Sequence, residues 1–497
     1  MILGKKNYTG TLEYKGIDFF FVFDGAQLSL IPPKEKEDEI IWNWIHAEIK
    51  PGVYTLGDPL TTNVPFLCGN CSETGRMMMF LTREDSFIGF DNTTLCIDIV
   101  GLIECQTSNR KYCRMTLSND ELNYIHPINR AFYQEFDPGD LQKSGVIAIK
   151  TREFSEITTE KKRFLFEGKD VIVNFSIGWK CSASNGNPPI LLNSNIIFEF
   201  QETDDYWYLL RLWRLAEKLV QFLTFRKNAR FQESTLQVKF DDEHYRKAAD
   251  FRLVAPVRSE TDSSLEKGRY IALAQLESKE DKLLSLISED SLYLRHLPGS
   301  FKDGKSLDAA TFVLTSAAFE WEFGRLYPDG VMKSDRKANA EKQALEEMQI
   351  AIDNSTGEVK NILKHCRKMI GFSNLESKII QAGKDFDSTV GLFGKHLYQL
   401  SKEEFSYSAI GKRLANQRND FAHGNIDKEF NGPAILDLLF LRYLIYAMQM
   451  RRVGVSERNI QNAINDLFGL HIVITDKTSI EKAAEQGDLE KGPIERD

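Results

Sequence analysis

The stretch RNDFAHGN, from Arg418 to Asn425, lies near the end of a long region with helical periodicity. It contains an arginine and a histidine with four residues between them, and an asparagine directly after the arginine. Arg418 carries a permanently charged planar fork that suits phosphate oxygens, and His423 can donate or accept a proton near neutral pH. RNA supplies its own nucleophile, the 2′-hydroxyl group, so a base, an acid and a cation are enough to cleave it. The stretch therefore predicts a metal-independent endoribonuclease site.

The region around this stretch, residues 301–475, predicts a helical bundle. Its apolar residues recur at helical spacing between short turns, which is typical of an up-and-down arrangement. We expect Gly424 to cap the motif helix, Pro433 to lie in the first turn of the next helix, and Gly454 to end that helix. The charged residues 476–497 are expected to form a loosely held tail. The expected helices span 306–327, 337–353, 357–370, 401–423, 434–452 and 456–468, with one or two more over 374–400.

The first 200 residues read mainly as strands, so the fold class expected for the whole chain is α+β and multidomain. Many short strands in succession predict a sandwich or a distorted barrel, here interpreted as a sensor or regulatory domain. Residues 201–300 are expected to form a mixed bridging region, with helices over 204–225 and 279–295 and strand-like pieces at 235–240 and 270–275. The expected strands of the first region span 11–14, 17–23, 27–31, 76–82, 94–99, 145–151, 163–166, 171–177 and 195–202.

Composition limits the class of protein. With 497 residues, 42% of them hydrophobic and 27% charged, the chain is typical of a globular protein with two or three domains. A net charge of −9 argues against coating of nucleic acid through bulk charge, so any contact with RNA requires a local basic patch. The N-terminus lacks the apolar core of a signal peptide, and the longest apolar run is interrupted by Asp437 and Arg442. Seven cysteines favour reduced thiols, so we expect a cytoplasmic location and no membrane contact.

The residues around the motif strengthen the prediction. Asn419 and His423 are four residues apart, so they share one face of a helix, and the long side chain of Arg418 can reach a phosphate near the helix end. Lys412 and Arg413, one or two turns upstream, are the predicted RNA-binding patch. The alternative is structural: Arg418 forms a surface ion pair with Asp420, and His423 only caps a helix.

The pattern R-N-x-x-x-H in the second half of a helical bundle resembles the signature of HEPN ribonucleases. A β-rich first half joined to a helical region that contains RNDFAHGN resembles, more narrowly, the ApeA-like anti-phage proteins. The resemblance implies Arg418, Asn419 and His423 as catalytic residues, and products with a 2′,3′-cyclic phosphate and a 5′-hydroxyl. It also implies a homodimer or higher even oligomer, in which two bundles bring their motifs together. Abortive infection triggered by phage, with tRNA as the RNA cleaved, follows from the resemblance alone.

Other residues have competing interpretations. Glu320 and Glu322 are best interpreted as buried or rim ion pairs, with a carboxylate lent to a neighbouring motif as the alternative. Two rival functions remain open: a non-catalytic bundle that binds RNA or protein, and a structural or oligomerisation bundle with an incidental motif. No P-loop sequence is present, and no cofactor is expected. The pair Cys68 and Cys71, together with the later Cys105 and Cys113, leaves a zinc site open, although uncommitted reduced thiols are favoured.

Overall fold

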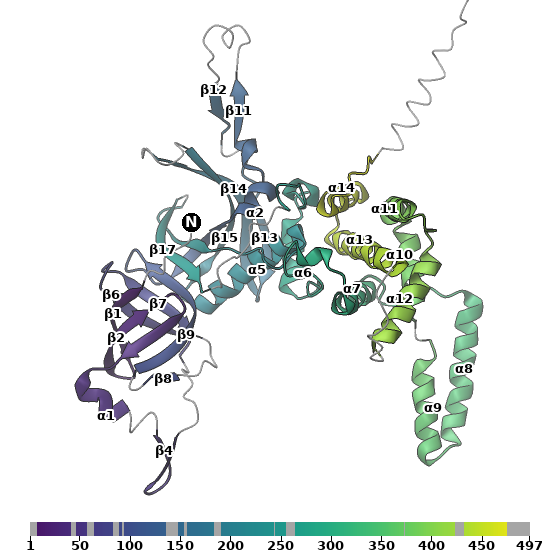
Figure 1. Cartoon of the computed structure of the whole chain (residues 1–497), viewed down its shortest axis with the longest axis horizontal. Coiled ribbons are helices and arrows are strands. Elements are labelled where there is room, and N and C mark those ends of the chain that lie inside the picture. The colour runs from purple at the N-terminus through teal and green to yellow at the C-terminus, as the bar shows by residue number, and fades with distance from the viewer. Residues whose placement is uncertain are drawn as a thin grey trace, which may run out of the picture. The chain divides into compact units, whose positions relative to one another are not determined.

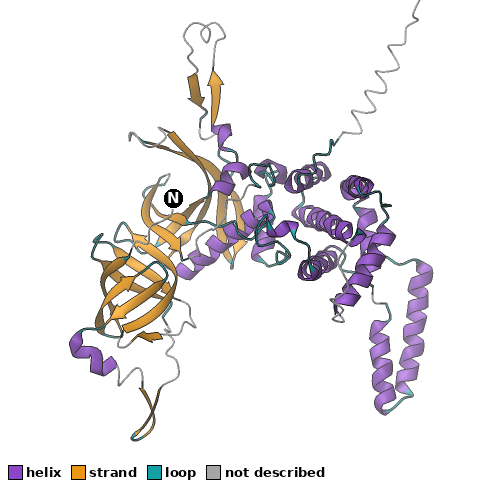
Figure 2. Ribbon diagram, in the orientation of Figure 1, coloured by secondary structure: helices purple, strands orange, loops and turns teal. Residues whose placement is uncertain are grey.

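Strands and helices are largely segregated along the chain in this computed structural model (Figures 1 and 2). Two compact units can be separated. The β unit comprises residues 1–222, 227–262 and 280–289, and the helical unit comprises residues 223–226, 263–279 and 290–497. The structure describes residues 7–40, 46–56, 64–82, 89–91, 94–135, 148–153, 157–182, 190–242, 244–254, 264–371, 373–422 and 432–474.

Six antiparallel strands of the β unit close into a barrel, because β9 pairs with both ends of the series β3–β2–β1–β6–β7. Alternate side chains point inward, and those of β2 bring Phe19, Phe21 and Phe23 into the core. Gly10 permits the close approach of β1 and β6, since a Cβ at this position would lie 2.0 Å from the carbonyl oxygen of Asn70. The barrel strands are β1 (Tyr8–Tyr14), β2 (Ile17–Phe23), β3 (Gln27–Ile31), β6 (Phe66–Cys71), β7 (Met77–Thr82) and β9 (Thr94–Cys105).

The second half of β9 also pairs with β17, and through it the barrel continues into an open antiparallel sheet. Helix α5 (Tyr206–Thr224) packs on this sheet through aromatic side chains. The ring of Trp213 lies 5.2 Å from that of Phe251, and the ring of Tyr208 lies 5.9 Å from that of Phe200. The strands, in spatial order from β9, are β17 (Tyr245–Leu253), β16 (Glu233–Lys239), β10 (Tyr112–Ser118), β15 (Ile190–Thr203), β14 (Lys169–Cys181) and β13 (Lys162–Phe166).

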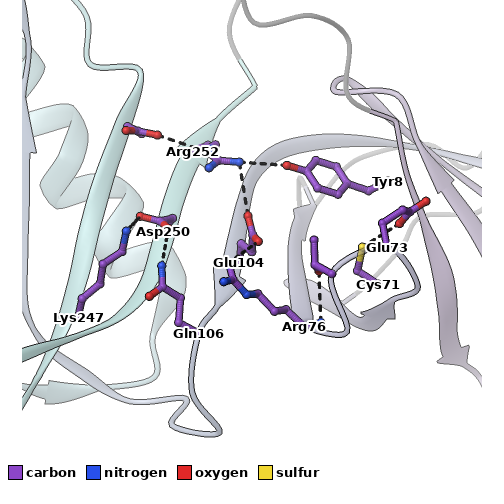
Figure 3. A network of polar contacts seen from close by, with 11 residues as sticks. Tyr8, Cys71, Glu73, Arg76, Glu104, Gln106, Lys247, Asp250 and Arg252 are labelled. Carbon is purple, nitrogen blue, oxygen red and sulfur yellow. Dashed lines mark hydrogen bonds and ion pairs between the residues drawn. The ribbon is translucent and has the colours of Figure 1, made fainter. Parts of the chain in front are cut away.

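A polar network links the barrel to the open sheet (Figure 3). Arg252 of β17 donates a hydrogen bond of 3.1 Å to the hydroxyl of Tyr8 in β1 and lies 3.6 Å from the carboxylate of Glu104 in β9. Arg76 contacts the same carboxylate at 2.9 Å. Glu104 is almost fully buried, so its charge depends on these two guanidinium groups. The network therefore fixes β17 against the barrel.

The helical unit is built around α13 (Pro433–Val453), which is buried along most of its length. Proline occupies its first turn, and Gly454 follows its end with a φ of 90°, as the sequence predicted. This is the one helix in the described part of the chain that is long and apolar enough to cross a membrane, and it lies mostly inside the unit. The other helices of the unit are α7 (Ala309–Leu326), α8 (Asp335–Asp353), α9 (Gly357–Met369), α10 (Leu375–Asp385), α11 (Asp387–Leu400), α12 (Tyr407–Ala422) and α14 (Glu457–Phe468).

The remaining elements are short. They include α6 (Glu280–Ser288), which packs on β13 within the β unit, and α2 (Asp120–Ile125), which contacts β15. The others are η1 (Lys34–Lys36), α1 (Glu37–Ile40), β4 (His46–Lys50), β5 (Val53–Leu56), β8 (Gly89–Asp91), η3 (Ile128–Ala131), β11 (Phe132–Glu135), β12 (Ala148–Thr151), η4 (Leu273–Leu276) and η5 (Asp303–Lys305).

The α+β layout expected from the sequence is confirmed, and of the two expected arrangements of the first strands, a sandwich or a distorted barrel, six strands form a barrel. The strand predicted at 270–275 is wrong, because residues 273–276 form the short helix η4. The region 201–300, expected as a separate bridge, divides between the two units, since β16 and β17 belong to the open sheet and residues 263–279 belong to the helical unit. Gly424 and the tail 476–497 lie outside the described residues.

Candidate functional site

The motif helix is α12, and one face of it is fixed by packing. Ile410 and Leu414 are buried at the four-residue spacing of a helix face, and the ring of Phe421 lies 5.3 Å from that of Phe312 in α7. Gly411 allows α10 to approach closely, since a Cβ there would lie 2.9 Å from the carbonyl oxygen of Glu376. The last turn of α12 is therefore held in place while its outer face remains exposed.

Arg418 lies on this last turn and is oriented by an ion pair. Its Nη2 atom is 2.7 Å from Oε2 of Glu320 in α7. The other oxygen of Glu320 accepts a hydrogen bond of 3.0 Å from Nζ of Lys378 in α10. A guanidinium has five N–H donors, so one ion pair leaves donors for a second anion. Because Arg418 remains 45% exposed, such an anion can approach from solvent.

Of the other two predicted catalytic residues, the structure describes Asn419 and does not describe His423. Asn419 is exposed on the last turn of α12, next to Arg418. His423 directly follows Ala422, the last residue of α12, and lies outside the described residues. Arg418 and Asn419 thus occupy consecutive exposed positions at the end of α12. The roles assigned to all three residues stay predictions.

Arg413 has a different partner from the one the sequence suggested. Its Nε and Nη2 atoms each donate a hydrogen bond of 2.7 Å to the carboxylate of Asp437 in α13, which also accepts one from the hydroxyl of Tyr398. Burial raises the pKa of Asp437, and both partners oppose this effect by bonding to the charged form. Arg413 therefore fastens α12 to α13, and its role in RNA binding stays a prediction. Lys412 is exposed and forms no ion pair within the described part of the chain.

The two glutamates of α7 are both in ion pairs, as their preferred interpretation stated. Glu320 forms the rim pair with Arg418. Glu322 is fully buried and accepts hydrogen bonds from Arg452 at 2.6 Å, from Gln449 at 3.0 Å and from the backbone of Tyr293 at 2.8 Å. Glu322 is therefore a structural residue, whereas Glu320 contacts the candidate site.

Three of the cysteines considered for zinc bond to different partners, and the fourth, Cys68, interacts electrostatically with Cys105. The Cys71 thiol donates to Glu73, Cys105 bonds the hydroxyl of Tyr112, and Cys113 bonds a backbone carbonyl of β16. Burial raises the pKa of the Cys105 thiol, which opposes formation of the thiolate that binds a metal. Over the described ranges, no three His, Cys, Asp or Glu side chains form a group that could hold a metal ion.

Two contacts of the site were missed by sequence reasoning. Lys378 carries no motif, and only folding brings α10 beside α7. Asp437 left a clearer signal, because a carboxylate inside an apolar helix needs a buried partner, and Arg413 supplies it.

No model of a known protein family matches the chain, and no curated protein is significantly similar to it.

Proposed function

We propose that the helical unit is a metal-independent endoribonuclease of the HEPN type. The observation that carries the proposal is the exposed last turn of α12, where Glu320 holds the guanidinium of Arg418 and Asn419 lies beside it. The motif histidine, His423, follows this turn directly in the sequence. A cation fixed at the rim of a bundle, followed by a titratable imidazole, matches the needs of RNA cleavage by the 2′-hydroxyl.

The chemistry assigns one role to each residue. His423 removes the proton of the 2′-hydroxyl or protonates the leaving 5′-oxygen, and a second copy of the motif in a paired bundle supplies the other step. The 2′-oxygen bonds to phosphorus as the P–O5′ bond breaks, which gives a 2′,3′-cyclic phosphate and a 5′-hydroxyl. Arg418 stabilises the charge on the phosphoryl oxygens, and Asn419 hydrogen-bonds the phosphate or the imidazole. Lys412 supplies a further phosphate contact from the exposed side of α12.

The proposed setting is anti-phage defence. A ribonuclease that cleaves host RNA, with tRNA as the proposed substrate, must be restrained until infection. The β unit is the proposed sensor of a phage-derived trigger. This setting rests on the resemblance of the motif and of the two-part layout to ApeA-like proteins. The rival function is a non-catalytic module that binds RNA or protein through the same helix end, and the engagement of Arg418 by Glu320 is the observation that favours it.

The test compares His423→Ala with wild type in a bacterial host, with and without a panel of phages, while new 5′-hydroxyl RNA ends are mapped. We expect wild type to generate such ends during infection and His423→Ala to reduce them at least about 100-fold, because general acid–base catalysis contributes on that scale. His396→Ala is the matched control, since His396 is an exposed histidine of α11 in the same unit. Cleavage by His423→Ala at the wild-type level contradicts the proposal, and RNA binding without cleavage by wild type supports the rival.

A further inference from the structure

Helices α8 and α9 form a hairpin whose two members pack chiefly on each other. Figure 1 shows the hairpin extending away from α7, α10 and α12 of the helical unit. Of all the residues in the two helices, Ile352 is the one that is fully buried. The hairpin therefore contributes little to the core of the unit, and its outer surface needs another explanation.

The outer face of α9 carries an apolar stripe. Val359, Ile362, Cys366 and Met369 follow one another at spacings of three, four and three residues, which is the spacing of a helix–helix seam. The exposed fractions of Val359, Ile362 and Met369 are 58%, 61% and 57%, and Cys366 is exposed as well. The neighbouring Leu363 is partly buried, so it differs from the exposed residues of the stripe. A continuous exposed stripe of this kind marks an interaction surface.

Charge is divided along the hairpin axis. We define the tip half as residues 346–363 and the base half as residues 335–345 and 364–369. The tip half contains four carboxylates and one lysine, and the base half contains six basic and two acidic side chains, so their formal charges are −3 and +4. The charged residues are, in the tip half, Glu346, Glu347, Asp353, Glu358 and Lys360, and in the base half, Asp335, Arg336, Lys337, Glu341, Lys342, Lys364, Arg367 and Lys368.

We propose that this hairpin pairs with the same hairpin of a second copy of the chain, with the two α9 helices antiparallel. A two-fold axis at the level of Lys364 places Ile362 opposite the partner's Cys366 and Val359 opposite the partner's Met369, so a larger side chain meets a smaller one at each level. The same axis sets each acidic tip beside a basic base, whereas a parallel arrangement would set tip against tip. A surface that is complementary to itself in this way is what a two-fold interface requires.

This inference does not rest on the ribonuclease proposal. It concerns a surface formed by α8 and α9, away from the last turn of α12, and the hairpins can pair whether or not His423 is catalytic. Absence of the hairpin crosslink described below overturns the pairing alone, and RNA cleavage that does not need His423 overturns the ribonuclease proposal alone.

Disulfide formation tests the contact and its direction. In a Cys181→Ser background, Ile362→Cys should form an intersubunit disulfide with the partner's Cys366 under mild oxidation, because the two positions face each other across the axis. The wild-type stripe should not crosslink in that background, since Cys366 lies opposite isoleucine. Lys364→Cys is the matched control, because it lies on the opposite side of α9. Crosslinking of Cys366 with itself, or of Lys364→Cys as efficiently as Ile362→Cys, overturns the antiparallel pairing.

Sedimentation of the full chain gives the second measurement. We expect wild type to dimerise and Ile362→Asp to raise the dissociation constant about tenfold or more, with an unchanged circular dichroism spectrum because the residue is exposed. Reversing the tip (Glu346→Lys with Glu347→Lys) or the base (Lys364→Glu, Arg367→Glu and Lys368→Glu) should weaken self-association, and mixing the two variants should restore it. A wild-type monomer at 50 µM, or a dimer that Ile362→Asp leaves intact, overturns the proposal. A monomer whose stripe binds phosphatidylserine vesicles overturns it in the same way.

Discussion

At the residue scale, two glutamates of α7 that are two positions apart have contrasting surroundings. Glu320 is 22% exposed and pairs with Arg418 at the rim, while Glu322 is fully buried with Arg452 as its charged partner. An exposed ion pair contributes little to stability because water solvates both charges, whereas removal of one partner from a buried pair strands the other. The same side chain, repeated within one helix turn, thus has a local role in one position and a structural role in the other.

We predict that Glu320→Gln lowers the free energy of unfolding by less than about 1 kcal/mol and that Glu322→Gln lowers it by about 3–5 kcal/mol. The larger effect follows because Arg452 and two further donors lose their acceptor charge inside the unit. Urea denaturation of the two variants, monitored by circular dichroism, measures the difference. Equal losses in both variants would show that the rim position is as important for folding as the buried one.

At the element scale, sequence patterns located most elements and did not reveal how they join. Short apolar runs bounded by turn residues placed β2 and β3 at their observed bounds, and helical periodicity placed α13 and α14 within a residue or two. The closure of the barrel depends on β9 pairing with β7 and β3 at once, and no local pattern encodes that pairing. The strand expected at 270–275 failed for a related reason, since tertiary contacts select the short helix η4 over β propensity. For the site, the motif located Arg418 and Asn419, but the partner Glu320 comes from a distant helix.

Helix α2 gives a prediction at this scale, because its end is fixed by a neutral histidine. His126 is buried, its Nε2 atom lies 3.1 Å from the carbonyl oxygen of Ile157, and its own carbonyl accepts a hydrogen bond from Ser194 of β15. Burial, with Arg130 nearby, lowers the pKa of His126 to about 4, from an ordinary value near 6.5. The unfolded chain therefore binds the proton first, so the contribution of His126 to stability is complete above pH 6.5 and is lost as the pH falls toward 4.

The expected loss is about 3 kcal/mol across that range, and His126→Gln should remove most of it while keeping a hydrogen-bond donor. Urea titrations between pH 7.5 and 4.5 give the free energy of unfolding as a function of pH for wild type and variant. The difference between the two curves cancels the contribution of the carboxylates that both proteins contain. An identical pH dependence in wild type and His126→Gln would refute the assignment.

At the scale of the whole molecule, neither unit is a continuous segment of sequence. The helical unit takes residues 263–279 from a region that also supplies β16 and β17 to the other unit. Within it, Glu277 accepts hydrogen bonds from the backbone of Ser456 at 3.2 Å and from Asn459 at 2.6 Å, so it caps the start of α14 from outside the helix. A boundary read from local composition near residue 300 therefore separates α14 from its cap. Sequence alone misplaces such a boundary because the contacts that define it span about 180 residues.

This arrangement predicts how fragments of the helical unit should behave. A fragment of residues 290–497 lacks Glu277 and the buried side chains of Ile271 and Leu276, whereas a fragment of residues 263–497 retains them. Both lack Phe225, whose ring packs 5.1 Å from that of Phe468, and loss of a packed aromatic side chain costs about 3–5 kcal/mol. We therefore expect the urea midpoint, followed by helical circular dichroism, to rise from the 290–497 fragment to the 263–497 fragment, and to be highest for the same helices in the whole chain. In the longer fragment, Glu277→Gln should lower the urea midpoint by part of the difference between the two fragments, because it removes the charged cap and keeps the apolar contacts. Equal midpoints for the two fragments would mean that residues 263–279 pack on the helical unit without stabilising it.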